Sequence, residues 1–277
     1  MTELINPFEA LALVPGWDPD ATDIEELKGG LTNRTYYIKQ DDMQCVMRLD
    51  SERSRIFQFD RSAELRILAE AGKAGLAPEV RFADVNAGIL VTEYLPGRVW
   101  QEADLDCTEN LESLAKLLRE VHALPRSGLR VDMTDIARTY ETHLEKRHGL
   151  HAYASRCVEI ISSLPSRGEA VCCHNDIVAA NIISGDDLQL IDWEFSCDND
   201  PLFDLASAIG FHNLDDNKAT FLLSAYAGGD DAELKERLAE QVRVFDAIQW
   251  LWLATLHLFS PKRWQAQRLE ELQQRIG

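Results

Sequence analysis

The stretch that decides the fold reads Val171-Cys172-Cys173-His174-Asn175-Asp176, and a second such stretch reads Leu188-Gln189-Leu190-Ile191-Asp192-Trp193-Glu194. Each is a short apolar run that ends in polar and acidic residues, a pattern typical of a buried strand that delivers side chains to a loop. Between them, Ile182 and Ile183 are expected to begin a strand, and residues 184–187 supply turn formers. The sequence therefore predicts a hairpin that begins at residue 182 and returns through residues 188–191.

The open end of this hairpin is expected to place an amide beside a carboxylate. If the hairpin is symmetric, its centre lies between Asp186 and Asp187, and Asn181 and Asp192 are equidistant from that centre. Residues related in this way lie opposite each other in an antiparallel pair. An amide oxygen beside a carboxylate forms a hard-oxygen site that suits Mg²⁺, which keeps its other positions for water and phosphate oxygens.

Asp176 lies five residues before Asn181 and is expected at the same end of the hairpin. A carboxylate in this position can accept or orient the proton of an attacking hydroxyl. Phosphoryl transfer needs little more than a metal that offsets the phosphate charge and a carboxylate that aligns the nucleophile. Because a single Asp or Asn after a strand is more often a turn former or a cap, it is the combination that favours a catalytic site.

The pattern His174-x-Asp176-x-x-x-x-Asn181, followed by Ile191-Asp192-Trp193-Glu194, resembles the catalytic and metal-binding segments of choline kinases, aminoglycoside phosphotransferases and their bacterial relatives. The resemblance extends from Gly29 to about Trp252. It implies a bilobal, protein-kinase-like fold and an enzyme that uses ATP and Mg²⁺ to phosphorylate a hydroxyl of a small molecule.

The same resemblance implies a role for each residue of the pattern. Asp176 is implied as the catalytic base, and Asn181 and Asp192 as the residues that hold Mg²⁺. Glu194 is implied either as a further metal ligand or as a residue that supports the ligands. His174 is implied to brace the loop rather than to react.

The nucleotide side begins with Gly29-Gly30-Leu31-Thr32-Asn33-Arg34-Thr35. This segment matches neither GxGxxG nor GxxxxGK[ST], but it resembles the opening segment of choline-kinase-like proteins, in which a loop covers the ATP phosphates. Glycines and hydroxyls can offer donors to anionic oxygens, so Thr32 and Asn33 are candidate ATP-binding residues. The alternative is that the two glycines form an ordinary turn.

Arg48 is the inward-facing basic residue of the strand that follows. Choline-kinase-like proteins often have arginine at a position where related kinases use lysine to contact the α- and β-phosphates. A guanidinium offers phosphate a planar fork, and Glu64 on the next predicted helix is its expected partner. The alternative is an exposed pair that contributes little. At the end of the last strand of this region, the resemblance implies that backbone groups of residues 91–97 pair with adenine, and the alternation of the strand makes Glu93 and Leu95 the candidates.

The acceptor of the phosphoryl group is indicated only by aromatic residues in an acidic chain. Aromatic faces near carboxylates hold quaternary or protonated amines by cation–π attraction, and Trp193 and Trp252 are the candidates. Choline kinases have two tryptophans one turn apart on a late helix. Here Trp252 matches the second, and Gln249 stands in place of the first, which is a departure from the pattern for choline. The alternative is that both tryptophans are packing residues.

The remaining chain predicts an α+β protein. Alternating residues over 34–39 and 43–49 indicate a strand pair, and strands are also expected over residues 80–83 and 88–94. Helices are expected over residues 62–72, 111–122, 135–148 and 245–259. The segment Tyr94-Leu95-Pro96-Gly97 is a breaker cluster, so the boundary is expected between a nucleotide-binding lobe of residues 1–95 and a catalytic, acceptor-binding lobe of residues 96–277. By resemblance, Asp204 at a helix start braces the catalytic loop.

The composition of the chain indicates which kinds of binding partner are favoured. The formal net charge is −19 over 277 residues, which disfavours nucleic acid and anionic membrane surfaces and favours a cationic ligand. The window of residues 245–259 is too short and too interrupted to cross a membrane. Six cysteines without a CxxC pair and the absence of a secretion-signal pattern predict a reducing, cytoplasmic location. The sequence does not indicate an oligomeric state.

Three alternatives remain open. The acceptor hydroxyl could belong to a sugar or an aminoglycoside rather than to an amino alcohol such as choline, ethanolamine or thiamine. The chain could bind a nucleotide without transferring phosphate, although Asp176 argues against this. A metal hydrolase using His174, Asp176 and Asp192 is the weakest alternative, because no second histidine cluster flanks them.

Overall fold

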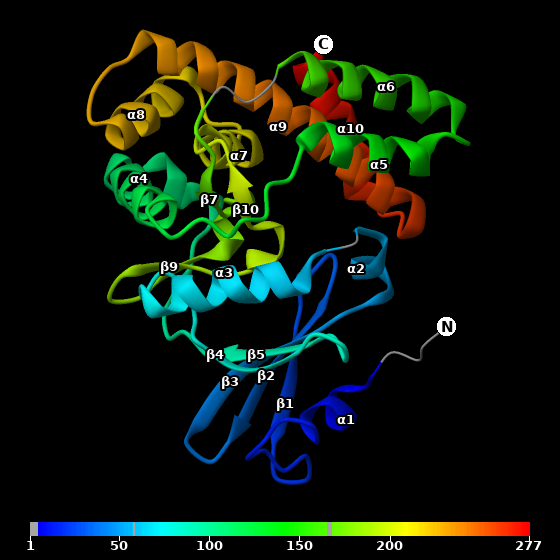
Figure 1. Ribbon diagram of the computed structural model, residues 1–277, viewed down its shortest axis with the longest axis vertical. Coiled ribbons are helices and arrows are strands. Elements are labelled where there is room, and N and C mark those ends of the chain that lie inside the picture. The colour runs from blue at the N-terminus through cyan, green and yellow to red at the C-terminus, as the bar shows by residue number, and fades with distance from the viewer. Residues whose placement is uncertain (1–4, 58, 165–167) are drawn as a thin grey trace. The chain divides into compact units, whose positions relative to one another are not determined.

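The chain forms two compact units (Figure 1). The computed structural model describes residues 5–57, 59–164 and 168–277. The first unit comprises Met1–Val99 and Ile183–Phe195, and the second comprises Trp100–Ile182 and Ser196–Gly277. The division after Val99 lies close to the boundary expected after Leu95. The inclusion of residues 183–195 in the first unit was not expected, since the sequence assigns the whole stretch after residue 95 to the second lobe.

The first unit is built on an antiparallel sheet with strand order β1-β2-β3-β5-β4. The strand bounds are β1 Asp23–Leu27, β2 Arg34–Gln40, β3 Met43–Leu49, β4 Val80–Asp84 and β5 Ile89–Glu93. The predicted strand pair and the two further predicted strands are therefore confirmed. Period-two alternation in β2 and β3 turns Ile38, Met47 and Leu49 inward, where each is fully buried. These side chains form a core with α1 (Pro7–Leu11).

Helix α3 (Arg61–Lys73) follows the short helix α2 (Glu52–Phe57). It begins at Asp60, whose carboxylate caps the backbone N–H of Ala63. Its buried positions recur with helical spacing, and among them Glu64 is only 2% exposed. Helix α3 packs against β4 and against the turn η3 (Trp193–Phe195), so the fold buries a carboxylate beside the second of the two sequence patterns.

The predicted hairpin is formed by β8 (Ile182–Ser184) and β9 (Leu188–Leu190), which join β6 (Arg98–Val99) in a small sheet. Gly97 makes this sheet possible, because a Cβ on it would lie 2.7 Å from the carbonyl oxygen of Ser184. The N–H of Leu190 donates to the carbonyl of Leu76, 2.8 Å away, after α3. These backbone contacts explain why the hairpin belongs to the first unit.

The second unit is mainly helical. Its helices are α4 Thr108–His122, α5 Met133–Leu144, α6 His148–Ser163, α7 Leu202–His212, α8 Asp216–Ala227, α9 Ala232–Phe259 and α10 Arg263–Ile276. The expected helix over residues 135–148 is corrected: α5 ends at Leu144, and Arg147, with φ −117° and ψ 79°, separates it from α6. The buried helix expected over residues 245–259 is the second half of α9.

A short antiparallel pair lies among these helices: β7 (Val171–Cys173) and β10 (Cys197–Asn199). All six cysteines are free thiols, as the irregular cysteine spacing predicts. Within the described ranges, no helix combines the length and the apolar character that a membrane crossing would require.

Helices α7 and α9 approach each other closely at Gly210. A Cβ there would lie 2.4 Å from Cδ1 of Phe245 and 3.2 Å from Oδ1 of Asp246. We expect Gly210→Ala to lower the free energy of unfolding by about 1–3 kcal/mol, because overpacking forces neighbouring groups apart. Urea denaturation monitored by circular dichroism measures this change.

The matched control is Gly149→Ala in α6, where no atom lies within 4 Å of the added Cβ. This variant is expected to be neutral or slightly stabilised. An unchanged urea midpoint for Gly210→Ala would contradict the close approach of α7 and α9.

Candidate active site

Strand β7 delivers the loop that carries Asp176. The loop begins at His174, which is fully buried, and passes through Asn175 in the left-handed conformation with φ 66°. Positive φ is uncommon for residues other than glycine and is frequent at functional sites. Asp176, the predicted catalytic base, follows directly and is half-buried.

The carboxylate of Asp204 on α7 anchors the start of this loop. It accepts the backbone N–H groups of His174 at 3.0 Å and Asn175 at 2.6 Å, and it is fully buried. It also lies 3.0 Å from Nε2 of His122, which must donate because a carboxylate only accepts. The role in bracing the loop that the resemblance implies for Asp204 is confirmed.

Two further side chains of α7 hold the next turn of the loop. The hydroxyl of Ser207 accepts the N–H of Ile177 at 3.0 Å, and Nε2 of His212 accepts the N–H of Ala179 at 3.1 Å. Asp176 therefore lies between anchored backbone positions on both sides. This arrangement fixes the direction of its carboxylate, as a general base requires.

His212 is itself held at a fixed helix end. Arg268 and Arg275 of α10 each donate to the carbonyl of Gly210 at 2.8 Å, at the C-terminus of α7, where cations are favoured. Arg275 also pairs with Asp246 at 2.7 Å. Burial, reinforced by the charge of Arg268, lowers the pKa of His212 to about 4. His212 is therefore neutral at physiological pH, and its Nε2 can accept a hydrogen bond.

Asn181 lies directly against Asp176. Its Nδ2 donates to Oδ2 of Asp176 at 2.8 Å and to the backbone carbonyl of the same residue at 3.1 Å. Since the amide nitrogen faces the carboxylate, the amide oxygen is the atom of this side chain that can bind a cation. Asn181 is the last residue of the turn η2 (Ala179–Asn181), directly before β8 begins at Ile182, so it lies outside the hydrogen-bonded strands of the hairpin. It is 7% exposed.

Asp192, the other predicted Mg²⁺ ligand, is also in the left-handed conformation, with φ 63°. Its side chain is 41% exposed, and its Oδ1 lies 3.9 Å from the guanidinium of Arg48. Asp192 belongs to the first unit, whereas Asp176 and Asn181 belong to the second. The proximity of the three side chains therefore stays a prediction.

The predicted pair of Arg48 and Glu64 is formed. Both Nη atoms of Arg48 donate to the Glu64 carboxylate, with 2.8 Å for the Nη2–Oε2 bond. Burial by itself would raise the pKa of Glu64, but Arg48 and Arg61 outweigh it and hold that pKa below its ordinary value. Glu64 is therefore ionised and fixes the guanidinium plane.

The carboxylate of Glu194 accepts hydrogen bonds from the loop before β2. It accepts the hydroxyl of Thr32 at 2.5 Å and Nδ2 of Asn33 at 2.7 Å, and it is only 2% exposed. Glu194 was expected either to bind the metal or to support the metal ligands, and these contacts favour the supporting role. The side chains of Thr32 and Asn33 are turned to Glu194, so phosphate contacts predicted for this loop would come from its backbone N–H groups.

Arg61 is the functional candidate that the sequence does not single out. It joins a set of charged side chains that we call the charged cluster: Arg48, Asp50, Arg61, Glu64, Asp192 and Glu194. Two guanidinium groups against four carboxylates leave a formal charge of −2. An excess of carboxylates around an exposed Asp192 fits a hard divalent cation such as Mg²⁺. Asn181 and Asp192 stay the predicted ligands of this cation.

A different group has metal-binding spacing in the second unit. Among the residues that the structure describes, His122, Cys173 and Asp204 are the set of His, Cys, Asp or Glu ligand atoms close enough to hold one ion. Hydrogen bonds account for this set, since Asp204 holds the loop and Nδ1 of His122 lies 2.8 Å from the Tyr226 hydroxyl. It contains none of the residues that the metal-hydrolase alternative requires.

The adenine candidates lie at the end of β5. The backbone N–H of Glu93 donates to the carbonyl of Glu79 at 3.0 Å, and the Glu93 carboxylate bonds Arg81 at 2.9 Å. The carbonyl of Glu93 is therefore the backbone group of this residue to consider for adenine. Leu95 follows the strand and is half-buried.

The two acceptor candidates differ in environment. Trp193 is 1% exposed, and its indole N–H donates to the carbonyl of Leu190 at 2.9 Å, so it is a packing residue rather than the wall of an open site. Trp252 is half-buried on α9. Trp250, two positions earlier, is fully buried against the ring of Tyr153.

The pKa of His212 generates a prediction for pH dependence. The pKa is about 6.5 in the unfolded chain and about 4 in the folded protein, so the unfolded chain binds more protons between these values. The stabilisation is nearly complete above about pH 6.5, is lost progressively as the pH falls toward the folded pKa of about 4, and is gone below it. From pH 7 to pH 5, His212 should account for a loss of about 2 kcal/mol in the free energy of unfolding.

His212→Gln keeps an oxygen that can accept the Ala179 N–H but does not titrate. We expect its loss of stability from pH 7 to pH 5 to be smaller than that of the parent protein by about 2 kcal/mol, measured by urea denaturation at both pH values. Other titrating groups are common to both proteins and cancel in the difference. Equal losses in the two proteins would contradict the assignment.

Comparisons with known proteins agree with this architecture. The model of the phosphotransferase enzyme family matches residues 23–241. Protein LicA of Haemophilus influenzae is 29% identical over 208 residues, which are 72% of this chain and 61% of that protein. The probable choline kinase 2 of Arabidopsis thaliana is 27% identical over 211 residues, or 69% of this chain and 59% of that protein. The chain thus spans about three fifths of the length of these two relatives.

A solved structure is similar over nearly the full length. The choline kinase LicA from Streptococcus pneumoniae superposes with a TM-score of 0.77 at 22% identity, covering 92% of each chain. At this identity the likeness speaks for the fold, and it confirms the predicted α+β, protein-kinase-like fold. Since the family model covers most of the sequence, the chain belongs to the phosphotransferase enzyme family.

Proposed function

We propose that the protein transfers the γ-phosphoryl group of ATP to the hydroxyl of a small, cationic amino alcohol of the choline, ethanolamine or thiamine type. The observation that carries the proposal is the contact of Asp176 with Asn181 on a loop whose backbone is anchored by Asp204, Ser207 and His212. A rigid carboxylate beside a metal-binding amide is what in-line phosphoryl transfer requires.

Asp176 is the general base of the proposed reaction. Its carboxylate accepts the proton of the acceptor hydroxyl while the hydroxyl oxygen forms a bond to the γ-phosphorus. The bond between the γ-phosphorus and the β–γ bridging oxygen breaks, and ADP leaves with that oxygen. Asn181 and Asp192 would hold Mg²⁺, which supplies positive charge against the phosphate oxygens.

The first unit would hold the nucleotide. The guanidinium of Arg48, kept in plane by Glu64, is suited to the α- and β-phosphates. The loop of Thr32 and Asn33 would cover the phosphates through its backbone, and backbone groups of Glu93 and Leu95 would pair with adenine.

The six free thiols fit a reducing compartment, such as the cytoplasm.

The acceptor class is inferred from charge and from α9. A formal net charge of −19 favours a cation, and half-buried Trp252 can offer it an aromatic face. One observation favours a sugar or an aminoglycoside instead: Gln249, in place of the first tryptophan of the choline kinase pattern, is polar and lies 3.4 Å from Arg268. A site with hydrogen-bonding groups there suits a polyhydroxylated acceptor.

Release of ADP in the presence of Mg²⁺ tests the proposal across a panel of acceptors. The panel contains choline, ethanolamine, thiamine, simple sugars and aminoglycosides. Turnover with an amino alcohol supports the leading proposal, and turnover with only sugars or aminoglycosides supports the second. Binding of ATP without turnover of any acceptor would favour a nucleotide-binding protein that transfers no phosphate.

Replacement of the general base makes a sharper prediction. Asp176→Asn should lower kcat by about 10²–10⁴-fold, because the nucleophile loses its proton acceptor, while the Kd for ATP changes by no more than about threefold. The amide keeps the size of the side chain. Steady-state kinetics and calorimetric titration with ATP provide the two measurements.

Asp187→Asn is the matched control, because it removes an exposed carboxylate at the turn between β8 and β9, away from the loop of Asp176. It should retain the activity of the parent protein. Retention of full activity by Asp176→Asn would show that another group takes the proton.

A further inference from the structure

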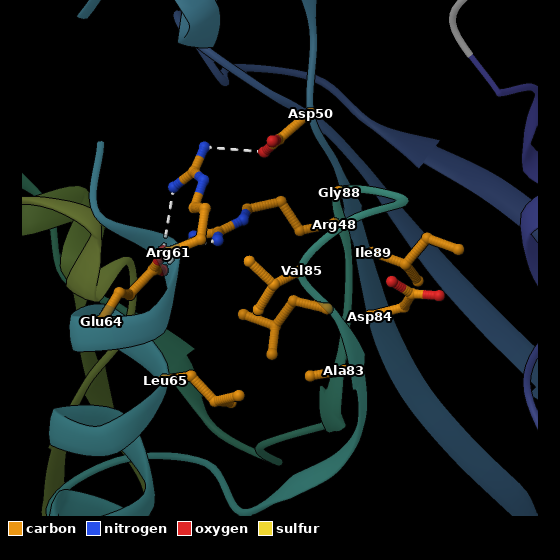
Figure 2. A pocket seen from close by; sticks show the side chains of 11 residues that line it. Arg48, Asp50, Arg61, Glu64, Leu65, Ala83, Asp84, Val85, Gly88 and Ile89 are labelled. Carbon is orange, nitrogen blue, oxygen red and sulfur yellow. Dashed lines mark hydrogen bonds and ion pairs between the residues drawn. The ribbon is translucent and has the colours of Figure 1, made fainter. Parts of the chain in front are cut away.

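Arg61 occupies a position at which several segments of the first unit meet. It is the first residue of α3, and its side chain is 11% exposed. Figure 2 shows the guanidinium reaching Asp50 on one side and Glu64 on the other, beside a pocket whose far wall is formed by residues 83–85 and 88–90, at the ends of β4 and β5 and in the turn between them.

The guanidinium uses both of its Nη atoms on different segments. Nη2 lies 2.8 Å from Oδ1 of Asp50, at the end of β3, and 2.9 Å from Oδ1 of Asn33, in the loop before β2. Nη1 lies 2.9 Å from Oε2 of Glu64 and 3.2 Å from Oε2 of Glu194. Arg61 therefore connects the loop, the end of β3, helix α3 and the turn η3 through one planar group.

The charges make this connection necessary. The side chain of Glu194 is 2% exposed, and Arg61 is the only cation within ion-pair distance of it in the part of the chain that the structure describes. A buried carboxylate without a cation is strongly disfavoured. Without Arg61, Glu194 and Asp50 would draw on the remaining guanidinium of the charged cluster, that of Arg48. Arg61 thus leaves Arg48 free to keep its two-atom pairing with Glu64.

Geometry distinguishes arginine from lysine at this position. A single ammonium group cannot reach Asp50 and Asn33 on one side while it meets Glu64 and Glu194 on the other, whereas the planar guanidinium fork does so without rotation. Lysine would keep the charge but would satisfy at most part of this set. The conservative replacement therefore separates the effect of charge from the effect of shape.

We propose that Arg61 is the positioning residue of the nucleotide site. It acts through Glu194 and Asn33 on the loop that covers the phosphates, and through Glu64 on the phosphate-binding guanidinium of Arg48. The proposal rests on the proposed function, because it takes ATP to be the ligand of this unit. Arg61 itself touches neither substrate in this proposal.

The test compares Arg61→Gln and Arg61→Lys with Arg66→Gln, an exposed arginine of the same helix. Arg61→Gln is expected to raise the Kd for ATP, measured by calorimetry without acceptor, and the KM for ATP by about 10–100-fold. The KM for the acceptor and the Mg²⁺ concentration that gives half-maximal rate at saturating ATP should stay within about twofold. Arg61→Lys should recover only part of the ATP affinity, and Arg66→Gln should match the parent protein.

The outcomes separate the two proposals. Failure of the parent protein to bind ATP would overturn the proposed function and with it the ligand assumed here. ATP binding by the parent protein with equal affinity for Arg61→Gln would overturn the role of Arg61 alone. A large change in the Mg²⁺ requirement, with unchanged ATP affinity, would also overturn it, because it would place Arg61 and Glu194 at the metal rather than at the loop.

A second variant keeps the test decisive if Arg61→Gln does not fold. The double variant Arg61→Gln/Glu194→Gln removes a positive and a negative charge together, so it leaves no uncompensated carboxylate at residue 194. It is expected to fold and still to bind ATP about 10–100-fold more weakly than the parent protein. Parent-like ATP affinity in this double variant would contradict the proposal.

Discussion

The anchoring of the loop of Asp176 to α7 is the interaction on which the rest of the second unit depends. The loop that carries Asp176 also buries the backbone at residues 174, 175, 177 and 179, and each buried N–H group needs an acceptor. Side chains on one helix supply those acceptors: Asp204, Ser207 and His212 take the N–H groups of residues 174, 175, 177 and 179. Helix α7 can only do so if it is held against α9 by the close approach at Gly210 and if its end is capped by α10. Packing far from Asp176 thus determines the direction of its carboxylate.

A different constraint organises the first unit: carboxylates outnumber guanidinium groups in the charged cluster. Each buried carboxylate needs either a cation or hydrogen-bond donors. Glu64 takes two arginines, and Glu194 takes one arginine together with Thr32 and Asn33. The side chain of Asp192 is 41% exposed, and its Oδ1 lies 3.9 Å from the guanidinium of Arg48. The two buried carboxylates are thus compensated within the unit, and the cluster as a whole keeps a formal charge of −2.

Much of this could be predicted from the sequence, because short-range patterns carry the information. The alternation in residues 43–49, the turn of the hairpin and the helical spacing of α4 all depend on neighbouring residues. The pairing of Arg48 with Glu64 was predicted from the family resemblance, and the two residues are only 16 positions apart in the sequence. The contact of Arg61 with Glu194 spans 133 positions and that of His212 with Ala179 spans 33, and no local pattern marks either. The joining of residues 183–195 to the first unit depended likewise on the close approach of Gly97 to Ser184.

The residues in the left-handed conformation show that backbone strain, too, could not be predicted from the sequence. Asn175 and Asp192 have positive φ values of 66° and 63°. An asparagine or an aspartate in the sequence indicates this conformation much less strongly than a glycine does. In Asp41 and Asn213 the same conformation serves a hairpin turn and a helix end, where local geometry suffices to explain it. Asn175 instead precedes the candidate base, and Asp192 is itself a candidate ligand. A strained backbone costs on the order of 1–3 kcal/mol and persists only where its surroundings fix it. For Asn175 those surroundings are the carboxylate of Asp204, so the conformation that turns Asp176 toward Asn181 is maintained by an acid that takes no part in the proposed chemistry.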